Sequence, residues 1–158
     1  MSLLVLGYLG VELGGHVSDL PSCFSVSSVE SWGKTYICER ILTYVPVDIR
    51  NGQGLTLAHA NTAGVIFGVD LIIYWQKTFM SPLANYSAEG TFRDFKKFLS
   101  SKYGQPNISR QNEYFWISDT LAVHLMYASL ESGVYSVAVG YAWVPLIPKE
   151  FEGRQPSW

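Results

Sequence analysis

Charged side chains are scarce in this sequence, and their scarcity excludes several kinds of protein. Asp, Glu, Lys and Arg make up 15% of the residues, whereas about 25% is usual in globular proteins. Hydrophobic residues make up 48% and aromatic residues 15%, which is the opposite of the composition of a disordered chain. The 158 residues are therefore expected to form one globular domain with a substantial core.

The sequence also lacks any long run of positive charge. The formal net charge is -2, and the longest cationic run is the pair Lys96 and Lys97. Proteins that bind nucleic acid or an anionic membrane surface carry a basic patch or stripe. We therefore predict that nucleic acid is not a partner.

Long apolar runs are missing as well. The longest, residues 63–75, is interrupted by Asp70 and falls short of the roughly 20 residues that a membrane-spanning helix needs. Residues 1–13 are apolar, but they lack a basic start and contain Glu12, so they do not have the pattern of a signal peptide. We expect no insertion into a membrane and a cytoplasmic location, or an exported protein if a leader was removed.

Cysteine is rare, and the two cysteines allow two interpretations. A bridge between Cys23 and Cys38 would stabilise the fold by about 3 kcal/mol in the chain-entropy model. Two cysteines in a domain of this size are more often separate buried thiols. We therefore favour two thiols over a disulfide, and export of the protein would shift the balance toward the disulfide.

The motifs that identify enzymes and metal sites are absent. The sequence has no Gly-x-Ser-x-Gly turn, no phosphate-binding loop, no His-Glu-x-x-His and no Cys-x-x-Cys pair. Catalytic groups can also be assembled from distant segments, so this absence does not exclude an enzyme. We expect no cofactor and no metal, and a non-catalytic role is favoured.

One helix is strongly indicated by periodicity. It is predicted to begin at Thr91, with Asp94 completing an acidic variant of the capping box, and to end at Tyr103 before Gly104 and Pro106. The opposite side of this helix is polar. Its apolar stripe recurs at steps of three and four residues and consists of Phe92, Phe95, Phe98, Leu99 and Tyr103.

The rest of the chain has the pattern of β-strands. Strands are predicted within residues 3–13, 36–38, 41–47, 55–59, 65–75, 113–117, 121–127 and 134–144, with loops at 76–88 and 107–112. A short helical turn is predicted over residues 18–24. The expected fold is α+β, with one antiparallel sheet of about seven to nine strands and two helix-then-meander halves as a topological hypothesis. Residues 1–148 would form the domain, and residues 149–158 an extended or disordered tail.

The last predicted strand has a large-residue face and a small-residue face. Tyr135, Val137, Val139, Tyr141 and Trp143 alternate with small residues such as Ser136, Ala138 and Gly140. Both faces are therefore expected to be covered. The alternation leaves open which of the two faces the helix packs against.

Aromatic residues are more numerous than one core of this size needs. Tyr and Trp anchor protein interfaces and line ligand pockets, but a thick aromatic core is an equally good interpretation. The candidate binding residues are Trp75, Tyr114, Trp116, Tyr135, Tyr141 and Trp143.

Three polar residues in apolar surroundings form a second candidate site. His59 is predicted at a strand end, and Asp70 and His124 lie inside apolar strands. A hydrogen-bonded structural role is favoured for each of them over a catalytic acid, base or ligand. If the favoured interpretation fails, these residues would mark a pocket at a sheet end.

The end of the helix carries a family resemblance. Lys102-Tyr103-Gly104-Gln105-Pro106, followed by strands that contain Trp116, resembles a pattern in small bacterial α+β domains. Among them are the tandem β-lactamase-inhibitor-like domains and their outer-membrane-assembly relatives. The resemblance covers about the last third of the chain and implies a binding protein without catalytic activity. It assigns no functional residue.

Together these observations rank three functions. The first is a non-catalytic domain that binds a protein partner, with an inhibitor or immunity-type protein as one form of it. The alternative is a small-molecule-binding domain or enzyme with a pocket near His59, Asp70 or His124. The third is a homodimer formed through a sheet edge or an aromatic face.

Overall fold

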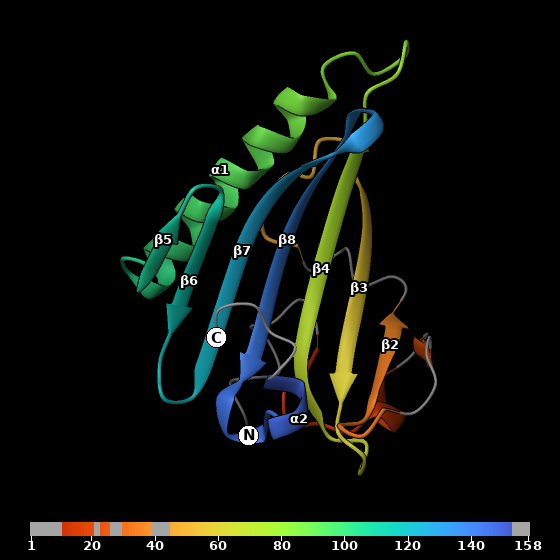
Figure 1. Ribbon diagram of the computed structural model, residues 1–158, viewed down its shortest axis with the longest axis vertical. Helices are drawn as coiled ribbons and strands as arrows, with labels where there is room; N and C mark the ends of the chain where they lie inside the picture. Colours follow the sequence, from red (N-terminus) through yellow and green to blue (C-terminus); the bar gives the residue numbers. More distant parts are fainter. Residues whose placement is uncertain (1–10, 21–22, 26–29, 39–44, 153–158) are drawn as a thin grey trace.

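The protein consists of one antiparallel β-sheet with one long helix packed against it (Figure 1). The structure is a computed structural model that describes residues 11–20, 23–25, 30–38 and 45–152. The sheet has eight strands. This arrangement confirms the α+β fold and the single antiparallel sheet expected from the sequence.

The strands follow a simple order across the sheet, which is β1-β2-β3-β4-β8-β7-β6-β5. Each half of the chain therefore makes a meander of four strands, and the last strand of each meander pairs with the other at the centre. Before the first meander, the described residues contain one short helical element, the 3-10 turn η2 (Val17–Asp19). The strands are β1 (Cys23–Ser25), β2 (Lys34–Cys38), β3 (Gln53–Ala60), β4 (Ile66–Gln76), β5 (Ile108–Arg110), β6 (Glu113–Ile117), β7 (Leu121–Leu130) and β8 (Val134–Trp143).

The central pair of strands has a core face formed by its larger residues. In the register of β4 and β8, Leu71 lies opposite Val139 and Ile73 lies opposite Val137, and the exposed fraction of these four side chains is 0–1%. Phe95 of the helix belongs to the same core cluster. The large-residue face is therefore the one that the helix covers, which answers the question that the alternation left open.

The helix α1 (Ala84–Tyr103) is longer than predicted, because it begins seven residues before Thr91. Its first two turns bury only small residues, Ala84 and Ala88, and small residues give a weak apolar periodicity. The prediction of a loop over residues 76–88 is therefore wrong for 84–88, and it is also wrong for Gln76, which belongs to β4. No helix in the described part of the chain is long and apolar enough to span a membrane.

Thr91 is an interior residue of the helix and does not cap it. It is fully buried, and its hydroxyl donates a hydrogen bond to the backbone carbonyl of Asp48 at 2.9 Å. Arg50 donates to the Thr91 hydroxyl at 3.1 Å and to Asp94 Oδ2 at 2.8 Å. The predicted capping pair therefore ties the helix to the loop between β2 and β3.

The end of the chain contributes a second small core on the other side of the sheet. The short helix α2 (Lys149–Glu152) carries Phe151, which is 8% exposed. The Phe151 ring packs against Trp32 and Phe67, each with a centroid separation of 4.8 Å. The expectation of an extended or disordered tail is therefore wrong for residues 149–152.

Several smaller predictions also differ from the structure. Residues 107–112 contain β5, and the helical turn predicted over 18–24 is limited to η2, since β1 begins at Cys23. Most of the strand predicted over 3–13 lies outside the described residues, and residues 11–13 are not in a strand. The strand predicted over 41–47 also lies largely outside them, and residues 45–47 are not in a strand.

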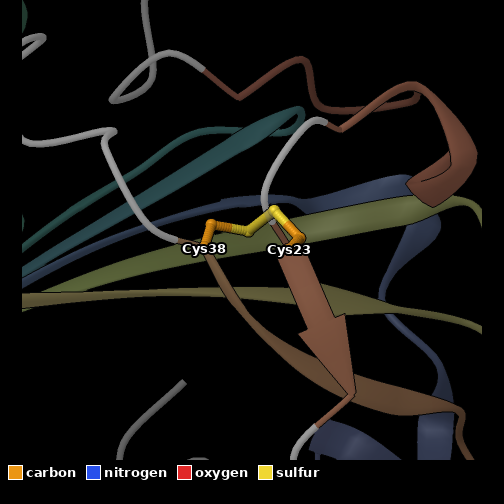
Figure 2. The surroundings of a disulfide bond; sticks show 2 residues. All are labelled: Cys23 and Cys38. Atoms are coloured by element: carbon orange, nitrogen blue, oxygen red, sulfur yellow. A yellow bond between two sulfur atoms is a disulfide. The ribbon is translucent and has the colours of Figure 1, made fainter.

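Cys23 and Cys38 form a disulfide bond, so the interpretation as two separate thiols is wrong (Figure 2). The two cysteines lie opposite each other in the register of β1 and β2, with 4.1 Å between their Cα atoms. Directly paired residues of neighbouring strands bring their Cβ atoms close together. This pairing of β1 with β2 could not be derived from the sequence, because no strand was predicted at Cys23.

Removal of this disulfide should destabilise the protein. The bond closes a loop with a sequence separation of 15 residues, and the double substitution Cys23→Ala/Cys38→Ala should lower the free energy of unfolding by about 3 kcal/mol. Urea unfolding of both proteins, with and without reductant, measures the loss. Reductant should lower the stability of the wild type to that of the variant, and equal stability without reductant would contradict the prediction.

Candidate functional site

The six aromatic residues predicted to bind a partner belong to the core on the α1 side of the sheet. Trp75, Trp116 and Tyr141 are 5%, 4% and 3% exposed. Tyr114, Tyr135 and Trp143 are partly buried and pack against the same core. Trp75, Trp116 and Tyr141 therefore contribute almost nothing to the surface, whereas Tyr114, Tyr135 and Trp143 are partly accessible.

The indole N–H groups of Trp75 and Trp116 both donate hydrogen bonds to backbone carbonyls. Trp75 Nε1 donates to the carbonyls of Ile49 and Arg50 at 3.0 and 3.1 Å. Trp116 Nε1 donates to the carbonyl of Gly104 at 2.8 Å. Each indole therefore fixes a loop against the sheet while its ring fills the core.

His59 and Asp70 are brought together on the face opposite α1. Asp70 Oδ2 lies 2.6 Å from His59 Nε2, and Thr35 Oγ1 lies 3.0 Å from His59 Nδ1. The side chain of His59 is 12% exposed and that of Asp70 is 40% exposed. The order of groups, hydroxyl–imidazole–carboxylate, is the order found in nucleophilic catalysis.

The space beside these groups does not fit a substrate. The cavity between His59, Asp70 and Phe151 has a volume of about 10 Å³, which is enough for no more than one water molecule. A hydroxyl can act on a substrate only if the substrate can reach it. The arrangement in this structure is therefore a hydrogen-bonded network that connects β2, β3 and β4.

His124 is not part of this network. It lies on β7, two strands from Asp70 in the sheet, and its Nε2 is 3.1 Å from Glu113 Oε2. Its ring stacks on Phe115 with a centroid separation of 4.4 Å. Within the described ranges no three or more His, Cys, Asp or Glu side chains are placed to hold a metal ion.

Tyr127 on β7 is a further titratable group of the sheet. Burial raises the pKa of its hydroxyl above the ordinary value of 10.0, and the negative charge of Glu89 and the neighbouring Tyr135 raise it further. The hydroxyl therefore stays protonated at neutral pH. It lies on the α1 side, where its ring packs against Phe92 at a centroid separation of 5.8 Å.

The exposed apolar residues gather at one end of the molecule. Seven large hydrophobic side chains are exposed among the described residues, and all of them except Phe24 lie where β4 leads into α1 or where β7 turns into β8. These two places are adjacent, since the Lys77 amide donates to the Gly133 carbonyl at 2.8 Å. We call these six residues the contact patch: Tyr74, Phe79, Met80, Leu83, Tyr86 and Leu130.

The tip of the contact patch is the connection between β4 and α1, which extends away from the body of the protein (Figure 1). Phe79 is 96% exposed and Met80 is 85% exposed. A hollow of about 520 Å³ adjoins this connection. Three residues of the contact patch, Tyr74, Met80 and Leu83, also line the hollow. The buried Trp75 lines it from the core side.

Sequence reasoning missed the contact patch. Phe79 and Met80 stand next to Ser81 and Pro82, and the prediction of a connection is correct for this segment, residues 77–83. Two adjacent large apolar residues in a loop are the signal that could have identified it, because a loop on the surface has no core in which to bury them.

Comparisons with known proteins found no match: no family model, no curated protein and no solved structure matches the chain. The resemblance to inhibitor-like domains therefore remains an expectation from a short motif.

The position of Asp70 depends on Gly140, and this dependence can be tested. A Cβ atom on Gly140 would collide with Asp70 Oδ1, so Gly140→Ala should displace the carboxylate from His59. The expected loss is about 1–3 kcal/mol of unfolding free energy, measured by urea denaturation. In an Asp70→Ala background the same substitution should cost much less, because the carboxylate is gone.

A matched control for this substitution is Gly68→Ala. Gly68 lies on β4 two residues before Asp70, opposite Ala142 of β8. A Cβ on Gly68 would lie 3.4 Å from its nearest neighbour, the Tyr141 carbonyl oxygen, and should be tolerated better. Equal costs for Gly140→Ala with and without Asp70 would show that the carboxylate is not the group that requires a glycine.

Proposed function

We propose that this protein is a non-catalytic domain that binds a protein partner through the contact patch. The observation that carries the proposal is the exposure of Phe79 and Met80, at 96% and 85%. Isolated apolar residues are normal on a protein surface. A group of six at one end is characteristic of an interaction site.

The residue types in the patch suit a protein interface. Tyrosine and phenylalanine supply large contact areas with few rotatable bonds, and methionine adapts its shape to the surface that it meets. Hot spots of interfaces are commonly built around such anchors near the centre of the contact. Phe79 and Met80 are the proposed anchors, and the other four residues of the patch surround them.

The proposed interface combines a projecting loop with an adjoining hollow. Phe79 and Met80 project outward, whereas the adjoining volume of about 520 Å³ can receive a side chain of the partner. Gln53 and Gln76 line the hollow with amide groups that can pair with backbone of a partner. A projecting loop beside a hollow is also compatible with a blocking role of the inhibitor or immunity type.

The cavity next to His59 and Asp70 argues against the alternative of an enzyme or small-molecule-binding domain with its pocket at these two residues. At about 10 Å³ it is far smaller than the roughly 300 Å³ of a typical ligand pocket. The protein-binding function is therefore the one that the arrangement of exposed residues supports best.

The proposal predicts that Phe79→Ser/Met80→Ser abolishes partner binding without destabilising the fold. Both side chains are almost fully exposed, so the free energy of unfolding should change by no more than about 0.5 kcal/mol. Loss of two anchors should weaken binding by about 30-fold or more. The measurement is quantitative affinity capture from an extract of the source cells, followed by titration of the captured protein.

The matched control is Phe24→Ser, which removes an aromatic side chain that is 51% exposed on β1, away from the patch. A partner should be captured by the wild type and by this control and lost with the double variant. A protein captured equally by all three would contradict the proposal. If the wild type self-associates in sedimentation and the double variant does not, the partner is a second copy of this chain.

A further inference from the structure

The outer side of α1 gathers positive charge although the whole chain is acidic. Residues 93–102 contain four of the 11 Lys and Arg residues and one acidic residue, a net charge of +3 in a chain whose total is -2. The rest of the chain therefore carries -5. The acidic residue, Asp94, is paired with Arg50 at 2.8 Å.

Three of these four cations line a groove that has an aromatic wall. The groove has a volume of about 490 Å³, and it lies between α1 and β6. We call it the cationic groove. It is lined by Phe92, Arg93, Lys96, Lys97, Ser100 and Tyr114.

The positive groups of the groove, which are Arg93, Lys96 and Lys97, form no salt bridge with the residues that the structure describes. Arg93 and Lys97 are exposed. Like charges at a spacing of three and four residues on one helix repel each other and cost a few tenths of a kcal/mol per pair. An anionic ligand in the groove would offset this repulsion.

The aromatic wall is ordered and positions one of the cations. Phe92 and Tyr114 are stacked with a centroid separation of 5.8 Å, and the Lys96 ammonium lies 4.5 Å from the centroid of the Tyr114 ring. A cation–π contact holds the ammonium near the ring and leaves its other side open. The groove therefore combines fixed positive charge with apolar surface.

We propose that the cationic groove binds an acidic segment of a protein, in which carboxylates flank an aromatic or aliphatic side chain. Residues 93 and 97 are about 6 Å apart along the helix axis, and carboxylates at alternate positions of an extended peptide are about 6.6 Å apart. Such a segment can pair one carboxylate with each end of the cationic row. Its apolar residue, at the next alternate position, would point to the same side of the peptide and lie against Phe92 and Tyr114.

The charge distribution favours a peptide over a nucleic acid. Nucleic-acid-binding proteins commonly neutralise about 6–10 phosphates, and the groove with Lys102 offers four cations. The net charge of -5 on the rest of the chain also opposes the approach of a long polyanion. This second surface is distinct from the contact patch, which consists of neutral residues.

The test is fluorescence anisotropy with three labelled probes at low salt. The first is a peptide of eight Glu residues with a central Phe, the second is the same peptide with Gln in place of Glu, and the third is a twelve-nucleotide oligothymidylate. The acidic peptide should bind more tightly than the other two. Its affinity should fall as salt rises from about 50 to about 300 mM, because exposed charges are screened.

Paired variants locate the binding. Lys96→Gln/Lys97→Gln should weaken binding of the acidic peptide about tenfold. Lys34→Gln/Lys149→Gln removes the same charge from β2 and α2 and should leave the affinity within about twofold. Phe79→Ser/Met80→Ser should not change it, so failure of the contact-patch proposal and failure of this one are distinguishable.

Three outcomes would overturn the inference. The wild type could fail to bind the acidic peptide, or the two lysine double variants could weaken binding equally, which would show diffuse attraction without a site. Tighter binding of the oligothymidylate, with the same loss in Lys96→Gln/Lys97→Gln, would assign the groove to single-stranded nucleic acid instead.

Discussion

The contact between α1 and the central strands β4 and β8 is the interaction on which the rest of the structure depends. Leu71 and Val139 lie opposite each other at the middle of the sheet, and both are buried with Phe95 and Leu99 of the helix. Burial of side chains of this size contributes about 1.5–3 kcal/mol each. Because β4 and β8 are the last strands of the two meanders, this contact joins both halves of the chain into one core.

This packing also determines where the protein can bind a partner. The chain leaves the sheet at Gln76 and must cross the end of the sheet before α1 begins at Ala84. A connection that passes around the end of a sheet has no core to enter, so Phe79 and Met80 remain in solvent. The same packing turns the other side of α1 outward and collects Arg93, Lys96 and Lys97 beside Tyr114. Both proposed surfaces are thus consequences of how one helix covers one face.

The sequence predicted the features that depend on periodicity and missed those that depend on pairing. The alternation in β8 and the stripe of α1 identified the residues of the core correctly, because burial repeats along each element. Periodicity does not reveal the start of α1, because Ala84 and Ala88 bury little surface. The sequence pattern predicts Thr91 as a cap, because its bond to Asp48 joins segments that are distant in the sequence. The disulfide likewise depends on which strands are neighbours, since it joins paired residues of β1 and β2. The cationic groove was not foreseen because part of its aromatic wall, Tyr114, belongs to β6, and only folding places it beside the cations of α1.

Hydrogen exchange of individual amides, followed by NMR, tests the central claim most directly. If the packing of α1 on β4 and β8 holds the fold together, the amides of Leu71 and Val139 should exchange only through global unfolding. The amides of Phe79 and Met80 should exchange within seconds, because that connection lies outside the core. Protection of Phe79 and Met80 equal to that of Leu71, or loss of protection in β4 and β8 before the edge strands, would contradict the account.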